Sequence, residues 1–125
     1  MGKKRILIID DEAGFTRLLK LTLERAGEFI VKEENDGARA LETAKEFRPD
    51  LIFLDIVMPK ADGGEVAAKL RAEPLLKRTP VVFLTAIVSK QEAQSGDLGG
   101  YPFLAKPVSL DSLITCIAEH LPDDE

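Results

Sequence analysis

The segment RILIIDD at residues 5–11 decides the fold class, because a nearly continuous apolar run stops at two aspartates. Strands that are buried on both faces of a parallel sheet have this character, whereas half-exposed strands alternate apolar and polar residues. Residues 51–54 and 81–84 repeat the pattern, and two shorter apolar segments resemble it more loosely. We therefore predict five strands, at Arg5–Ile9, Phe29–Glu34, Leu51–Leu54, Val81–Leu84 and Phe103–Ala105.

Amphipathic helical patterns lie between these strands. Apolar residues three and four positions apart indicate helices within residues 15–26, 40–47, 66–70 and 110–121. Gly27 is placed to end the first helix, and Ser109 is placed to cap the start of the last one. Residues 89–100 contain three glycines and few apolar residues, so we predict only a short or frayed helix there.

Strands that alternate with helices predict an α/β fold with right-handed crossovers. The expected architecture is a doubly wound five-stranded parallel sheet, flavodoxin-like (βα)5, in the order 2-1-3-4-5. A chain of 125 residues can bury its own core, so we expect residues 1–125 to form a single domain with no second domain after the last helix. In this strand order, ligands bind outside the carboxyl ends of strands one and three.

Composition excludes several classes of protein. The chain has 17 basic and 22 acidic residues, and its only basic run is at residues 3–5, so we expect no direct nucleic-acid binding. Its apolar runs are far shorter than the ~18 residues that span a bilayer, so we expect no membrane insertion. A single cysteine, Cys116, cannot form an internal disulfide, which indicates a reducing, cytoplasmic location.

The carboxyl ends of the predicted strands carry Asp10, Asp11, Asp55, Thr85 and Lys106. The strand order brings the three aspartates into one crevice, where two carboxylates ~4 Å apart repel each other by about 4 kcal/mol at an effective dielectric constant of 20. Such a cluster indicates a cation. Oxygen ligands without histidine or thiolate select Mg²⁺ or Mn²⁺, and magnesium shares its coordination shell with phosphate. The pattern therefore favours phosphoryl chemistry.

Each of these residues also has a simpler interpretation when taken alone. Asp10 or Asp11 could cap the following helix, and Asp55 could form a turn. Thr85 could be a cap or a satisfied core hydroxyl, and Lys106 could be a solvated surface residue. The prediction rests on their joint occurrence at strand ends that meet in space.

Several short motifs, taken together, resemble the receiver domain of two-component response regulators. They occur in the family's order at about its spacing, and the resemblance covers essentially the whole chain. The motifs are IIDDE at 8–12, LDIVMP at 54–59, Asp62-Gly63, LTA at 84–86 and FLAKP at 103–107.

The resemblance implies a role for each matching residue. Asp55 would be the phosphoacceptor, taking a phosphoryl group from a sensor histidine kinase or a histidine phosphotransfer protein. Asp10, Asp11, Asp55 and the backbone carbonyl of Val57 would hold Mg²⁺. Lys106 would pair with the phosphoryl oxygens, Thr85 would reorient toward them, and Phe103 would occupy the position of the switch aromatic residue. The Lys106–Pro107 bond would be cis, and an unidentified output protein would recognise the changed surface.

The resemblance implies a signalling module that catalyses its own phosphorylation, with at most a weak autophosphatase activity. A magnesium-dependent phosphohydrolase is the alternative enzyme, but such enzymes have a second aspartate two positions after the nucleophile, where this chain has Val57. A flavodoxin-like electron carrier would need a Ser/Thr/Gly-rich loop after the first strand, which is also missing. The apolar residues Val57 and Ile87 predict slow loss of phosphate.

The output side departs from the family pattern. The segment Gly99-Gly100-Tyr101-Pro102 replaces a turn rich in glycine and alanine. Pro102 is tolerated because the last strand is expected at the edge of the sheet. Tyr101 is expected to be a loop aromatic residue, and His120 a surface residue of the last helix.

Overall fold

Five parallel strands form the centre of the computed structural model, which describes residues 2–59, 61–86, 97–98 and 100–121. Their order is β2-β1-β3-β6-β8, as predicted, and Ile6 lies beside Leu51 where β1 and β3 pair. The doubly wound α/β architecture is therefore confirmed. The strands are β1 (Lys4–Ile9), β2 (Phe29–Glu34), β3 (Leu51–Asp55), β6 (Val81–Thr85) and β8 (Tyr101–Ala105).

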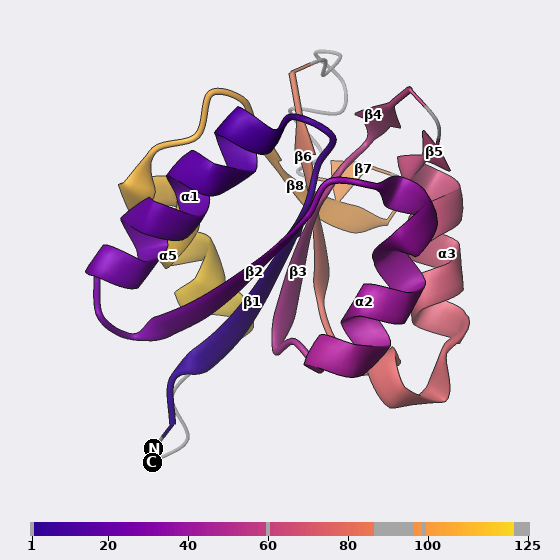
Figure 1. Cartoon of the computed structure of the whole chain (residues 1–125), viewed down its shortest axis with the longest axis horizontal. Coiled ribbons are helices and arrows are strands. Elements are labelled where there is room, and N and C mark those ends of the chain that lie inside the picture. The colour runs from indigo at the N-terminus through magenta and orange to yellow at the C-terminus, as the bar shows by residue number, and fades with distance from the viewer. Residues whose placement is uncertain (1, 60, 87–96, 99, 122–125) are drawn as a thin grey trace.

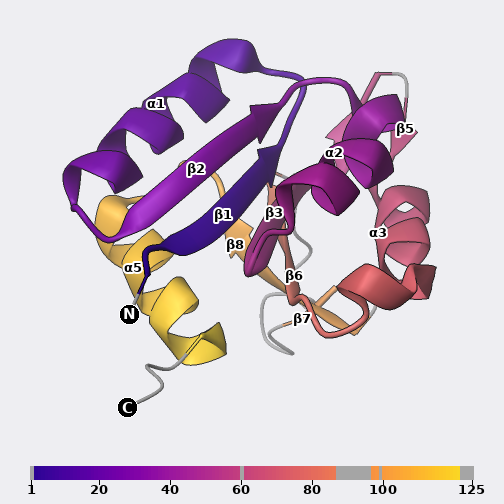
Figure 2. The ribbon, with the colours of Figure 1, turned by 60° about the horizontal axis from the view of Figure 1, so that its bottom comes forward.

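Helices cover both faces of this sheet (Figure 1). The helices α1 (Ala13–Arg25) and α5 (Leu110–His120) pack on one face, and α2 (Ala40–Phe47) and α3 (Gly63–Ala72) pack on the other. A second view separates the two helical layers (Figure 2). The sheet therefore has a hydrophobic core on each side, as its continuous apolar strands require.

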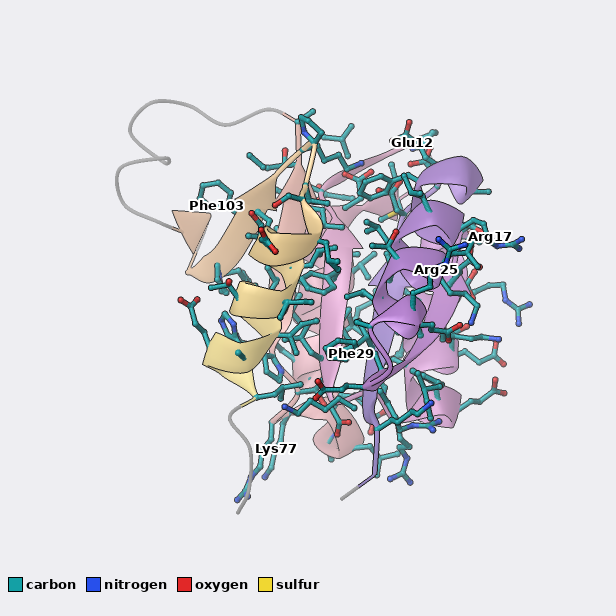
Figure 3. The ribbon with its side chains drawn as sticks, turned by 90° about the vertical axis from the view of Figure 1, so that its left-hand side faces the viewer. Glu12, Arg17, Arg25, Phe29, Lys77 and Phe103 are labelled. Carbon is teal, nitrogen blue, oxygen red and sulfur yellow. The ribbon has the colours of Figure 1, made fainter. Side chains whose placement is uncertain are left out.

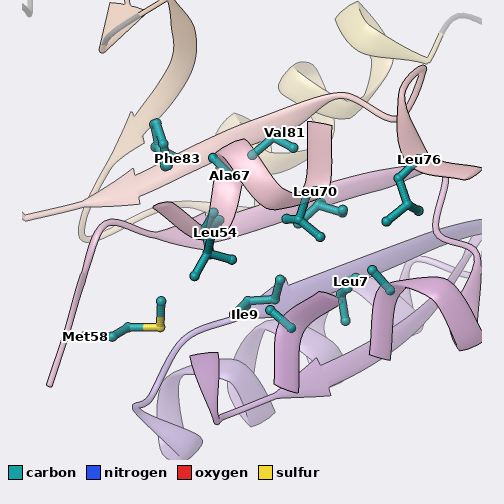
Figure 4. Packing of buried hydrophobic residues seen from close by; sticks show 13 residues of the cluster. Leu7, Ile9, Leu54, Met58, Ala67, Leu70, Leu76, Val81 and Phe83 are labelled. Atoms are coloured by element: carbon teal, nitrogen blue, oxygen red, sulfur yellow. The ribbon is translucent and has the colours of Figure 1, made fainter. Parts of the chain in front are cut away.

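Successive residues of one strand contribute to opposite cores, because side chains alternate across a sheet. Ile6 and Ile8 pack in the core beneath α1 and α5, whereas Leu7 and Ile9 pack in the core beneath α2 and α3 (Figure 4). All four are fully buried. The end of β1 is therefore held firmly on both sides, directly before the two aspartates.

The helix ends explain how the chain enters and leaves the sheet. Gly27 follows α1 with a φ of 91°, a left-handed conformation that glycine adopts without strain. The Ser109 hydroxyl accepts a hydrogen bond from the Ser112 backbone N–H at 3.1 Å, so this residue is the N-cap that the sequence predicts. The N-cap of α1 is Glu12, so neither Asp10 nor Asp11 fills that role.

The structure also contains short elements that the periodicity did not predict. A small hairpin of β4 (Val57–Met58) and β5 (Ala61–Asp62) follows β3 and leads into α3. The 3₁₀ turn η1 (Gly37–Arg39) precedes α2, and a second 3₁₀ turn, η2 (Pro74–Leu76), follows α3. Gly37 lies so close to the hairpin that an added Cβ would be 2.6 Å from the Ala61 Cβ.

The last parallel strand is not at the edge of the sheet, which corrects the prediction. A two-residue strand, β7 (Asp97–Leu98), pairs antiparallel with Tyr101 and Pro102 and lies outside β8. The predicted frayed helix at 89–100 lies mostly outside the described residues, and at 97–98 the chain forms this strand instead. Gly100, with a φ of 89°, supplies the tight turn between β7 and β8.

Tyr101 is part of the fold and not a loop aromatic residue, which is a second correction. Its ring packs edge-on against Phe83, with the ring centres 5.0 Å apart. The guanidinium group of Arg71 lies over the same ring, 4.7 Å from its centre. This contact ties the start of β8 to α3.

Among the described helices, none is long and apolar enough to cross a membrane.

Candidate functional site

Three carboxylates meet at the carboxyl ends of β1 and β3. Asp10 and Asp11 follow β1, and Asp55 is the last residue of the neighbouring strand β3. One carboxylate oxygen from each residue lies within 4.8 Å of the others. Asp10 is fully buried and Asp55 is 6% exposed, whereas Asp11 is exposed. The predicted convergence of these residues is therefore confirmed.

Asp10 is held by two hydrogen bonds to its carboxylate. One oxygen accepts the backbone N–H of Glu12 at 2.9 Å, and the other accepts the ammonium of Lys106 at 2.7 Å. These bonds explain how a carboxylate is tolerated at a site without solvent exposure.

Lys106 extends from the end of β8 into the same cluster. Its Nζ lies 3.2 Å from Glu12 Oε1 and 3.9 Å from Asp55 Oδ1. Burial alone would lower the pKa of Lys106, but the hydrogen bond to Asp10 and the charges of Asp10 and Asp55 outweigh burial and raise it. The lysine is therefore a fixed positive charge beside the carboxylates.

Asp55 has an unusually high affinity for a proton. Burial, and then the negative charge of Asp10, raise its pKa from 3.8 to about 6, although Lys106 and the Val57 backbone N–H act in the opposite direction. Near neutral pH the carboxylate is ionised but poorly compensated. Additional positive charge at this site would therefore be favourable.

An open pocket of about 450 Å³ lies over this cluster, at the carboxyl end of the sheet. In Figure 3 this is the end of the molecule where Glu12 is labelled, and Lys77 marks the opposite end. It is large enough for a phosphoryl group and its water. Thr85, only 2% exposed, reaches the pocket from the end of β6, as predicted. The lining residues are Asp11, Glu12, Asp55, Val57, Met58, Pro59, Thr85, Ala86 and Lys106.

Phe103 lies outside the lining of this pocket. It is half-buried in β8, paired in register with Phe83, and packs against the core beneath α2 and α3. The Lys106–Pro107 peptide bond beyond this strand is cis, as the resemblance implied. Ile87 lies outside the described residues.

The residues present fit a hard divalent cation. The cluster offers only carboxylate oxygens, and Val57 lines the same pocket. Oxygen donors of this kind suit Mg²⁺ or Mn²⁺ and do not select zinc or copper.

Sequence reasoning missed three residues that support the site. Glu12 and Phe15 both contact Lys106, but in the sequence Glu12 stands out only as the end of the IIDDE motif, and Phe15 only as part of the apolar stripe of the first helix. Asn35 donates a hydrogen bond to the main-chain carbonyl of Asp10. The sequence could have indicated Asn35, because this residue directly follows β2, and β2 pairs with β1, the strand that ends before Asp10.

The sequence matches the response regulator receiver domain over residues 6–118, and the chain belongs to this family. It is 32% identical over 121 residues to the polar-differentiation response regulator DivK of Brucella anthropi, covering 96% of this chain and 98% of DivK. It is 37% identical over 111 residues to the DNA-binding dual master transcriptional regulator RpaA of Synechocystis, covering 88% of this chain and 46% of RpaA. The chain thus spans about half the length of such transcriptional regulators.

Solved structures agree with this assignment. The chemotaxis protein CheY4 of Vibrio cholerae has a TM-score of 0.84 at 30% sequence identity, covering 96% of this chain and 100% of that one. The protein is therefore a receiver domain of two-component signalling, with the CheY-like flavodoxin fold that the strand order predicted.

Proposed function

We propose that this receiver domain accepts a phosphoryl group on Asp55 from the phosphohistidine of a sensor histidine kinase or a histidine phosphotransfer protein. The convergence of three carboxylates with Lys106 and Thr85 at one pocket supports this proposal. The reaction would take place in the cytoplasm, and a separate output protein would recognise the phosphorylated form.

Asp10, Asp11, Asp55 and the Val57 carbonyl would hold Mg²⁺, or Mn²⁺ in its place. When bound, the cation supplies positive charge that offsets the carboxylates and the incoming phosphoryl oxygens. This role matches the raised pKa of Asp55, because burial and Asp10 leave that carboxylate in need of a counter-charge.

Asp55 acts as the nucleophile. A lone pair on its carboxylate oxygen forms the new bond to phosphorus, and the P–N bond of the donor breaks with its electron pair returning to the imidazole nitrogen. The carboxylate needs no base, since above pH ~6 it is ionised. Lys106, 3.9 Å from Asp55 Oδ1, balances charge on the phosphoryl oxygens, and the Thr85 hydroxyl donates a hydrogen bond to one of them.

Phosphorylation would then change the packing of the output side. It adds roughly two negative charges at Asp55, which attract Lys106 away from Asp10 and Glu12 and draw Thr85 inward. Thr85 pairs in register with Ala105, two residues beyond Phe103. Movement of Thr85 would therefore alter the room available to the half-buried Phe103 and shift the surface of β8 and α5 between two packings.

Intact-mass analysis tests this function. Incubation with Mg²⁺ and phosphoramidate should add one phosphate to the wild type and none to Asp55→Asn. Asp62→Asn is the matched control, because Asp62 is an exposed aspartate at the same edge and asparagine can keep its cap on Gly64. Chelation of the cation should abolish the reaction. Phosphorylation of Asp55→Asn would contradict the assignment, and sustained release of inorganic phosphate would indicate a phosphohydrolase.

A further inference from the structure

Asn35 connects the end of β2 to the loop that carries the aspartate pair. Its side-chain amide donates one hydrogen bond to the main-chain carbonyl of Asp10 at 2.8 Å and another to Thr16 Oγ1 at 2.9 Å. The backbone of this region is also paired, since the Asp10 N–H donates to the Glu34 carbonyl at 3.1 Å. One side chain thus binds both the start of the β1–α1 loop and the first turn of α1.

The other partners of Thr16 extend this network. Thr16 is fully buried, and its Oγ1 lies 2.8 Å from Glu33 Oε1. The second carboxylate oxygen of Glu33 pairs with Arg17 Nε at 3.0 Å. We call Asn35, Thr16, Glu33 and Arg17 the β2 bracket. It joins the first turn of α1 to the end of β2, and none of its members lines the pocket over Asp55.

The bracket acts on the peptide group between Asp10 and Asp11. The Asp10 carbonyl that accepts the Asn35 amide belongs to the same rigid plane as the Asp11 N–H. If that plane rotates, the Cα of Asp11 and its exposed carboxylate turn with it. The Asp10 carboxylate is fixed separately by Glu12 and Lys106. The hydrogen bond from Asn35 thus limits the orientation of Asp11.

We propose that Asn35 is a positioning residue that sets the affinity of the carboxylate cluster for Mg²⁺. This inference rests on the proposed function only in that the same cluster holds the cation. Groups that orient metal ligands without touching the metal change affinity by roughly 10–100-fold when they are removed. Asn35 acts through a main-chain carbonyl and one of two aspartates, so its effect belongs at the lower end of that range.

Calorimetric titration with Mg²⁺, in the absence of any phosphodonor, measures this effect directly. Asn35→Ala should weaken binding about tenfold. Asn35 is exposed, so the substitution leaves the core intact. Ile30→Ala is the control, since it removes a 40% exposed side chain near the start of β2, at the other end of the strand from Asn35, and should keep the wild-type affinity.

Thr16 provides a second, independent comparison. Thr16→Val keeps the shape of the buried side chain but removes the hydroxyl that accepts the Asn35 amide, so it should also weaken Mg²⁺ binding. Thr16→Ser keeps the hydroxyl and should restore most of the affinity. If Thr16 had a purely structural role, the substitutions would lower thermal stability, but the serine and valine variants would not differ in their affinity for Mg²⁺.

Two results would overturn the proposal. One is an Asn35→Ala chain that binds Mg²⁺ within about twofold of the wild type, and the other is a wild type that binds no Mg²⁺. Failure of the proposed function has a different signature: a wild type that binds Mg²⁺ but takes no phosphate on Asp55. In that case the affinities of the variants still decide the role of Asn35.

Discussion

The ammonium group of Lys106 lies over the aromatic ring of Phe15, 4.4 Å from the ring centre. Phe15 is in the first turn of α1 and packs against the core beneath α1 and α5. A cation over a ring face is attracted by about 0.5–2 kcal/mol, the larger value applying where water is excluded. The side chain of Lys106 is only 14% exposed, so little water competes with this contact. The ring of Phe15 therefore restricts where the ammonium group can lie.

The first prediction concerns this ring. Phe15→Leu keeps an apolar side chain but removes the ring face, so Lys106 should be held less firmly beside Asp55. We expect phosphorylation by phosphoramidate to slow about threefold or more, in line with the energy of one cation–π contact. Phe15→Tyr retains a ring and should react at nearly the wild-type rate. Equal rates for the leucine and tyrosine variants would contradict the role of the ring.

The second prediction concerns pH. Folding raises the pKa of Asp55 from 3.8 to about 6, so between these values the folded chain binds more protons than the unfolded chain. This group therefore lowers the free energy of unfolding as the pH rises through that window, and the full penalty applies above pH ~6. In the absence of divalent cations, Asp55→Asn should exceed the wild type in stability by about 1 kcal/mol near neutral pH, with little difference near pH ~4.

Urea denaturation in a chelating buffer at the two pH values measures this difference. Asp62→Asn, at an exposed position, should show no comparable gain. Mg²⁺ should narrow the gap, because a cation that binds the folded wild type stabilises it by mass action. An Asp55→Asn variant that is less stable than the wild type near neutral pH would contradict the environment described for this carboxylate.

The sheet and the acidic cluster could be predicted because both follow from strong, local patterns. Continuous apolar runs such as Leu51–Leu54 indicate strands buried on both faces, and the order of a doubly wound sheet then brings Asp10, Asp55 and Lys106 to one edge. Only residue type and strand order enter that argument. The chemical roles of these residues came from the family resemblance and stay predictions.

The remaining features depend on contacts between distant segments, which periodicity does not contain. Two-residue strands such as Asp97–Leu98 have no measurable alternation, and the contact of Tyr101 with Arg71 joins parts of the chain far apart in sequence. The hydrogen bond from Asn35 to Asp10 required the β1–β2 register as well as the strand order. Each was missed because it is a tertiary contact that the local sequence pattern does not contain.

The third prediction concerns the close approach of α3 to the backbone of Asp55 and Ile56. An added Cβ at Gly63 would lie 2.6 Å from the Ile56 Cα and 2.7 Å from the Asp55 carbonyl oxygen, both backbone atoms. Gly63→Ala should therefore displace this loop, lower the free energy of unfolding by about 1–3 kcal/mol and slow phosphorylation. Gly64→Ala is the matched control in the next position, where the nearest atom belongs to the Asp62 side chain at 3.2 Å. Equal stability of the two variants in urea would contradict this account.

The last prediction concerns the lifetime of the phosphorylated form. The Val57 side chain is 63% exposed and lines the pocket beside Asp55, so it stands where water would approach the phosphoryl group. An apolar side chain cannot orient that water. Val57→Asn should therefore shorten the half-life of the phosphorylated chain several-fold, because an amide can hold the attacking water by a hydrogen bond. Val57→Leu, which stays apolar, should leave the half-life nearly unchanged, and both variants keep the Val57 carbonyl position. Decay is followed by intact mass after removal of the phosphodonor, and an asparagine variant that decays no faster than the wild type would exclude this explanation.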